Sequence, residues 1–351
     1  MQFKIGKYNL SNRHPSFIVA ELSGNHGGSL SRAIKLIKYA KKAGANAVKL
    51  QTYKADTITF KSKSKDFKID PNSPWSKFNN YWDLYNYAHT PWSWHKKLFK
   101  FAKDINIEIF SSPFDETAVD LLENLKCPAY KIASSEINHI PLLERVAKTK
   151  KPVILSIGLA NLKDIHLAIR TLKKNGCKKI AILKCVSSYP SPISEQNLKV
   201  IPDIKKRFKV LSGLSDHTIG NTCALASVVM GGSIVEKHFN LKSKSKTVDS
   251  FFSSDVKRFK KMVDDIRLAE QAIGKVDYNI SKSSKKNLNG RRSIYVVKSI
   301  EKGEKFTIKN IKVIRPGFGL HPTFFKKILG KISKKKLKEG TRLKKIFIKS
   351  L

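Results

Sequence analysis

Two patterns of apolar residues alternate along the chain between Phe17 and His238. Short runs rich in β-branched residues predict strands, and the stretches between them repeat apolar positions every three or four residues, which predicts helices. Strands that alternate with helices favour a parallel sheet covered by helices. Eight runs qualify as strands: Phe17–Glu21, Ala47–Gln51, Glu108–Ser112, Ala129–Ala133, Pro152–Ser156, Ile180–Cys185, Val210–Ser215 and Ser233–His238. Eight strands over about 220 residues fit a (β/α)8 TIM barrel.

The segment after the first predicted strand has the sequence features of an α-helix. Leu30, Ile34, Ile37 and Ala40 recur at helical spacing. Ser29 or Ser31 can cap the start of this helix, and Gly44 suits a left-handed residue after its end. The sequence therefore predicts one well-formed strand and helix pair.

Two regions depart from the regular alternation. Residues 54–106 form an insertion with four tryptophans, for which we expect a helical excursion packed against the barrel wall. Long segments of this kind also shape or cover active sites. Residues 279–289 are rich in Ser, Lys and Asn and predict a linker. Short β-like pieces, Ile294–Val297 and Phe306–Ile308, then predict a small β-containing domain. We expect a barrel domain over 1–278, a linker over 279–290 and a small domain over 291–351.

The composition, 41% hydrophobic and 27% charged, is that of a soluble globular protein. No apolar run approaches the roughly 20 residues of a membrane helix, so we expect no membrane insertion. The first residues lack the apolar core of a signal peptide, which favours the cytoplasm. The four cysteines show no C-x-x-C spacing, so we expect them to be reduced and mostly buried.

A net charge of +42 offers a rival interpretation, a protein that binds nucleic acid or an anionic membrane. Residues 285–351 alone hold 21 Lys and Arg against three acidic residues. The excess is almost entirely lysine and is spread along the chain, and no aromatic residues that would stack on bases alternate with the basic ones. We therefore favour a drift in composition and expect no nucleic-acid partner.

The chemistry of a (β/α)8 barrel lies at the carboxyl ends of its strands. Nearly every predicted strand of this chain ends in a reactive or polar side chain, which a barrel used only as a scaffold would not need. In chain order these are Glu21, Lys49 and Gln51, Ser112 and Asp115, Lys131 and Ser134, Ser156, Lys184 with Ser187 and Tyr189, Asp216 and His217, and Glu236 and His238. The sequence therefore predicts an active site at this end of the barrel.

Two kinds of site are suggested by these strand ends. His217 and His238 end adjacent strands, so their imidazoles could share a divalent metal ion. The lysines would be costly to bury unless they faced an anion, and with the serines they predict a small, multiply charged ligand. A Schiff base on Lys131 is a competing but less economical hypothesis.

Several polar residues keep two interpretations. Glu21, Asp216, Glu236 and Asp249 supply carboxylates for proton transfer or for sugar hydroxyls. Glu236 shares a strand face with His238, so it is either a ligand or a partner of a ligand. Asp115 could cap the following helix, and His26 could bind ligand or shape the first loop.

Read together, these strings resemble the sialic acid synthase family over almost the whole chain. The matching pieces are Ala20-Glu21 with Asn25-His26, Val48-Lys49-Leu50-Gln51-Thr52, Tyr130-Lys131-Ile132-Ala133-Ser134, Ser188-Tyr189-Pro190, Leu214-Ser215-Asp216-His217-Thr218 and Glu236-Lys237-His238-Phe239. Three further segments look most like the pseudaminic acid synthases within the family: Thr90-Pro91-Trp92, Phe110-Ser111-Ser112-Pro113-Phe114-Asp115 and Val248-Asp249-Ser250-Phe251-Phe252-Ser253. The resemblance implies a barrel followed by a small antifreeze-like (SAF) domain.

The resemblance also implies a reaction and its residues. Phosphoenolpyruvate would condense with 2,4-diacetamido-2,4,6-trideoxy-L-altrose and water to give pseudaminic acid and phosphate, with cleavage of the C–O bond. Neuraminate or legionaminate synthesis by the same mechanism is the alternative. His217 and His238 would hold Mn2+ or Mg2+ as catalytic metal ligands, and Glu21 would position sugar or water and move protons. The residues implied for phosphoenolpyruvate are Lys49, Ser112, Lys131, Ser134, Ser156, Ser187 and Ser215, and those for the sugar are Gln51, Tyr189, Asp249 and Arg315.

Two further implications concern assembly and departures from the family. In related enzymes the antifreeze-like domain reaches over the barrel of a partner subunit, so Arg315 would meet substrate across a domain-swapped homodimer. Ile157 and Val186 stand where the family commonly has threonine, and Leu159 replaces a methionine. Each of these changes removes a hydroxyl or alters packing beside the predicted anion site.

Overall fold

The computed structural model describes residues 2–242 and 245–350. The chain folds into two compact units, Met1–Gly274 and Lys275–Leu351. Each unit has its own hydrophobic core.

The first unit is a closed barrel of parallel strands. In the described residues its strands are β3 (Phe17–Glu21), β4 (Ala47–Thr52), β5 (Glu108–Pro113), β6 (Tyr130–Ile132), β7 (Val153–Ser156), β8 (Ile180–Cys185), β9 (Leu211–Asp216) and β10 (Ile234–Asn240). Each strand pairs in parallel with the next, and β10 pairs with both β9 and β3, which closes the sheet. The predicted (β/α)8 fold and its strands are therefore confirmed.

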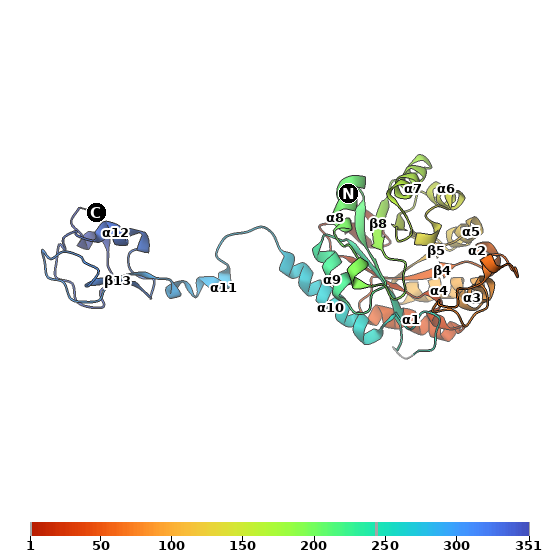
Figure 1. The fold of residues 1–351 in the computed structure, drawn as a ribbon, viewed down its shortest axis with the longest axis horizontal. Coiled ribbons are helices and arrows are strands. Elements are labelled where there is room, and N and C mark those ends of the chain that lie inside the picture. The colour runs from red at the N-terminus through yellow and green to blue at the C-terminus, as the bar shows by residue number, and fades with distance from the viewer. Residues whose placement is uncertain (1, 243–244, 351) are drawn as a thin grey trace. The chain divides into compact units, whose positions relative to one another are not determined.

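Helices follow the strands and cover the outside of the barrel (Figure 1). They are α1 (Leu30–Lys42), α4 (Trp92–Asp104), α5 (Glu116–Asn124), α6 (Ile140–Lys148), α7 (Leu162–Lys174), α8 (Val200–Phe208), α9 (Thr222–Val229) and α10 (Val256–Ile273). Helix α1 begins where predicted, because the Ser29 side chain accepts a hydrogen bond from the Arg32 backbone N–H. Leu36, Ile37 and Ala40 are fully buried on one face of this helix, as the apolar spacing requires.

The tryptophan-rich region contains both an insertion and a regular barrel helix. Helix α4 packs beside α1 with Leu98 and Ala102 in the core, so the insertion proper ends near Thr90. The insertion holds two short helices, α2 (Ala55–Ile58) and α3 (Tyr81–Ala88). Trp94 packs against the barrel wall as expected. Trp75 instead joins a small separate cluster of apolar side chains that includes Val248.

Short elements that the sequence pattern did not predict complete the first unit. Strands β1 (Gln2–Ile5) and β2 (Tyr8–Ser11) form an antiparallel hairpin whose Phe3, Ile5 and Leu10 join the barrel core. Strand β11 (Ser254–Asp255) pairs with the end of β10. Among the helices of the described residues, none combines the length and apolar character that a membrane span requires.

The second unit is small and irregular. Residues 275–292 are exposed and include α11 (Lys282–Lys285). Strands β12 (Ser293–Val296) and β13 (Ile311–Ile314) pair antiparallel, and α12 (Phe325–Ile328) packs with them around Phe306. The prediction of a strand over Phe306–Ile308 is wrong. Phe306 is a core residue, but the backbone N–H of Thr307 donates to the Asn310 side chain and begins a turn.

Candidate active site

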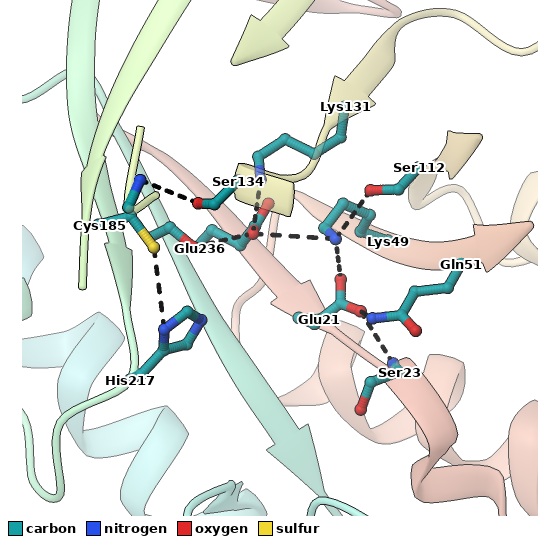
Figure 2. A network of polar contacts seen from close by, with 12 residues as sticks. Glu21, Ser23, Lys49, Gln51, Ser112, Lys131, Ser134, Cys185, His217 and Glu236 are labelled. Atoms are coloured by element: carbon teal, nitrogen blue, oxygen red, sulfur yellow. Dashed lines mark hydrogen bonds and ion pairs between the residues drawn. The ribbon is translucent and has the colours of Figure 1, made fainter. Parts of the chain in front are cut away.

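Four charged side chains from four strands meet inside the carboxyl end of the barrel (Figure 2). Lys49 Nζ lies 2.5 Å from Glu21 Oε2 and 3.8 Å from Glu236 Oε1, and Lys131 Nζ lies 3.2 Å from the same Glu236 oxygen. No side chain of the four is more than 5% exposed. Two lysines and two glutamates therefore form a buried charge cluster, within which every ion is paired.

Burial and pairing shift the acid-base properties of this cluster. Burial raises the pKa of Glu21 to about 7, against the opposing effect of Lys49. Burial also lowers the pKa of Lys131. Burial alone would raise the pKa of Glu236, but Lys131 and Lys49 outweigh it and lower the pKa. The charge of Glu21 thus changes near neutral pH.

The predicted serines surround the charge cluster and a neighbouring glycine. Ser112 accepts a hydrogen bond from Lys49 (3.2 Å), and Ser215 donates one to Glu236 (3.1 Å). A methyl group on Gly158 would lie 2.3 Å from Ser187 Oγ and 3.0 Å from Ser134 Oγ and Cys185 Sγ, so only glycine fits between them. Within the described residues the buried hydroxyls of Ser156 and Ser187 have no hydrogen-bond partner, so both are available to an anionic ligand.

His217 and His238 lie side by side, with ring centroids 5.4 Å apart. His217 Nδ1 lies 2.8 Å from the Val186 carbonyl oxygen. Burial alone would lower the pKa of His217, but Cys185 and this hydrogen bond outweigh it and raise the pKa. His238 Nδ1 is buried and meets no partner among the described residues. Burial and the neighbouring His217 hold the pKa of His238 well below its usual value, so His238 is a neutral imidazole.

The neutral His238, whose buried Nδ1 has no partner among the described residues, fits a bound divalent ion, and His217 lies beside it. Residues 2–242 and 245–350 contain no group of three or more His, Cys, Asp or Glu side chains arranged to hold a metal. His217 and His238 are the two residues that would hold such an ion.

The residues predicted for the sugar divide between the two units. Gln51 donates to Glu21 Oε1 (3.1 Å), and the Tyr189 ring lies 4.4 Å from His217. Asp249 is half-buried, and its partial burial raises its pKa. Arg315 lies exposed on the loop after β13 in the second unit, so the role expected for it stays a prediction.

Other candidates have structural partners. Asp216 alternates to the outer face of its strand, where it pairs with Lys237 (2.7 Å), so it does not join the charge cluster. Asp115 caps α5 by accepting from the Ala118 N–H. His26 is buried and accepts from the Gly28 N–H (3.2 Å), which supports its role in shaping the first loop.

Several functional features were absent from the predicted site or left open. Glu236 was expected to be a metal ligand or the partner of one, but its carboxylate instead pairs with both lysines. The Ser23 N–H donates to Glu21 (3.0 Å), and the Gly158 neighbourhood could not be found from one sequence. The four cysteines, all described, are buried and free as expected.

Comparison with known proteins identifies the family of the chain. The NeuB family model matches residues 36–278, and the SAF domain model matches residues 291–345. The chain belongs to the NeuB family. The resemblance inferred from the strand-end strings is therefore confirmed.

The pseudaminic acid synthase of Campylobacter jejuni (serotype O:2) is 42% identical and covers 97% of this chain and 98% of its own. The pseudaminic acid synthase of Helicobacter pylori is 44% identical over 94% of this chain and 96% of its own. A solved N-acetylneuraminic acid synthetase from Leptospira borgpetersenii, in complex with citrate, superposes with a TM-score of 0.72 at 29% identity, over 83% of this chain and 96% of its own.

Proposed function

We propose that this chain is a pseudaminic acid synthase that condenses phosphoenolpyruvate with 2,4-diacetamido-2,4,6-trideoxy-L-altrose and water. The observation that carries the proposal is the buried charge cluster (Figure 2), which lies at the same end of the barrel as the neighbouring side chains of His217 and His238. Relatives above 40% identity with that name, aligned over nearly the whole chain, support the choice of sugar.

Phosphoenolpyruvate would occupy the lysine and serine side of the site. Without ligand, the ammonium groups of Lys49 and Lys131 are paired with the carboxylates of Glu21 and Glu236. An incoming anion would therefore compete with these carboxylates for the ammonium groups. The unpaired hydroxyls of Ser156 and Ser187 would donate to its oxygens. Ser112, Ser134 and Ser215 lie within the same network and would complete the set.

His217 and His238 would hold a divalent ion, Mn2+ or Mg2+. When bound, such an ion supplies Lewis acidity that polarises the aldehyde of the open-chain sugar. Gln51, Tyr189 and Asp249 would orient the sugar so that its aldehyde carbon faces C3 of phosphoenolpyruvate.

Glu21 is suited to position water or sugar and to move protons. Its carboxylate accepts from Lys49, Gln51 and the Ser23 N–H, which fixes its orientation, and its pKa of about 7 lets it exchange a proton at neutral pH. C3 of phosphoenolpyruvate forms the new carbon–carbon bond to the aldehyde carbon. Water then adds to C2, and the tetrahedral intermediate loses phosphate by cleavage of the C–O bond.

The active assembly would be a homodimer in which Arg315 of one protomer reaches the barrel of its partner. Arg315 is exposed and free to meet another molecule. Of the three departures from the family pattern, Ile157 is packed in the core, Leu159 is exposed, and Val186 acts through its backbone carbonyl. None of them removes a side chain that the proposed reaction uses.

Phosphate release from phosphoenolpyruvate tests the proposal. The purified chain is assayed with the trideoxy altrose, with the legionaminate precursor and with N-acetylmannosamine, each with Mn2+ and with chelator. We expect metal-dependent release with the trideoxy altrose. Release with another sugar would change the product and keep the mechanism, and no metal-dependent release with any sugar would refute the proposal.

A further inference from the structure

We propose that Trp75 and Phe251, together with Tyr189, form an apolar subsite for the end of the amino sugar that is remote from its aldehyde. The groups recognised would be the C6 methyl and the methyl of the C4 acetamido group. This inference rests on the proposed function and adds the residues that select the sugar.

The three rings come from different parts of the chain and meet at the mouth of the barrel. Trp75 belongs to the insertion, Tyr189 follows β8, and Phe251 precedes β11. The Trp75 ring centroid lies 5.6 Å from that of Tyr189 and 6.0 Å from that of Phe251, in edge-to-face geometry. The rings therefore form one continuous apolar wall.

This wall continues directly from the reacting centre. The ring centroids of Tyr189 and His217 lie 4.4 Å apart. Those of His238 and Phe252, the neighbour of Phe251, lie 4.6 Å apart. Trp75 is the next ring outward from Tyr189. A sugar whose aldehyde lies at the histidines would extend its opposite end along these rings.

Hydrogen bonding and packing fix the position of Trp75. Its indole N–H donates to the Val248 carbonyl oxygen (3.2 Å), next to Asp249. Val248 also packs with Ile69, Leu84 and Ala88 of the insertion. The insertion and the segment that carries Asp249 and Phe251 are thus tied together, so the wall is held in place before a ligand arrives.

The wall has apolar surface to offer. Phe251 is 44% exposed, and Trp75 and Tyr189 are half-buried. The trideoxy altrose carries a methyl at C6 and an acetamido group at C4, where N-acetylmannosamine carries hydroxyls. Covering a methyl group with an apolar ring removes apolar surface from water, which stabilises the complex, whereas covering a hydroxyl group does not. The wall would therefore favour the trideoxy altrose.

Steady-state kinetics of the full chain test this inference with Phe251→Ala, Trp75→Ala and Trp75→Phe. Phe251 is at the surface, so its replacement leaves the fold intact. Loss of contacts to a methyl group changes discrimination about tenfold or more. We expect Phe251→Ala and Trp75→Ala to raise KM for the trideoxy altrose about tenfold with KM for phosphoenolpyruvate unchanged, and Trp75→Phe to retain most of the affinity.

Trp82→Ala is the matched control, since Trp82 lies in the same insertion beside Lys54 and Trp92, in a different hollow. The control should keep the wild-type KM for the sugar. Unchanged KM in both Phe251→Ala and Trp75→Ala, with an active wild-type enzyme, would overturn the subsite. An equal loss for both substrates would also overturn it. An inactive wild-type enzyme would instead refute the proposed function, which keeps the two failures separate.

Discussion

Replacing Glu236 by glutamine tests the charge cluster without changing its shape. In the described residues Glu236 is the acidic partner that lies within salt-bridge distance of Lys131, and both side chains are at most 5% exposed. Glu236→Gln therefore leaves a buried ammonium without its counter-ion. Breaking a buried pair from one side costs about 3–5 kcal/mol, whereas an exposed pair contributes about 0–1 kcal/mol.

Urea unfolding followed by tryptophan fluorescence measures this cost in the barrel. All four tryptophans lie between residues 75 and 94, so the signal reports the first unit and not the second. Asp104→Asn is the control, because it removes one partner of an exposed pair with Lys100. We expect a loss of about 3–5 kcal/mol for Glu236→Gln and of less than about 1 kcal/mol for the control.

A second variant separates loss of charge balance from general damage. Lys131→Met in the Glu236→Gln background removes the stranded charge, so it should recover part of the lost stability. Phosphoenolpyruvate should also stabilise Glu236→Gln in urea, because its anionic groups would replace the missing carboxylate. A cost for Glu236→Gln no greater than that of Asp104→Asn would refute the reasoning.

Three further predictions concern the reaction. His217→Ala and His238→Ala should abolish metal-dependent turnover and weaken Mn2+ binding in calorimetry while circular dichroism stays that of the wild type; full activity in either variant would remove the metal assignment. The ionised form of Glu21 accepts hydrogen bonds from three partners and forms as pH increases through about 7, so kcat/KM should rise over that range. The Glu21→Gln variant should bind phosphoenolpyruvate but turn over slowly, and its kcat/KM should lack this rise. A wild-type pH profile in the variant would exclude Glu21 from proton transfer. Gly158→Ala should raise the Kd of phosphoenolpyruvate about tenfold by displacing the Ser187 hydroxyl, since about 1.4 kcal/mol of lost hydrogen bonding gives that factor; an unchanged Kd in calorimetry would contradict the role given to Ser187.

The barrel strands could be predicted because their signal is local. Each is a short apolar run bounded by turns, and β3 and β8 have the predicted bounds. Phe306–Ile308 failed because a buried phenylalanine followed by a β-branched residue looks like a strand, while the Asn310 side chain that turns the chain lies outside the run. A local pattern cannot show which side chain completes a backbone hydrogen bond.

Some residues of the candidate site could be predicted from the sequence, and others could not. The rule that barrel chemistry lies at strand ends was enough to select Glu21, Lys49, His217 and His238. It could not separate Asp216 from the site, because its preference for Lys237 depends on which face of β9 it occupies. The position of Trp75 could not be predicted for another reason. Its indole N–H bonds to Val248, which lies 173 positions away in the sequence.

The most direct test of the central claim is one reaction with phosphoenolpyruvate that carries 18O in its bridging C–O–P position. The purified chain is supplied with this substrate, the trideoxy altrose and Mn2+, and the masses of the sugar acid and the phosphate are measured by mass spectrometry. The account predicts a nine-carbon acid with the mass of pseudaminic acid and all of the label in phosphate, because the C–O bond breaks. Label retained in the organic product, or phosphate released without that acid, would contradict it.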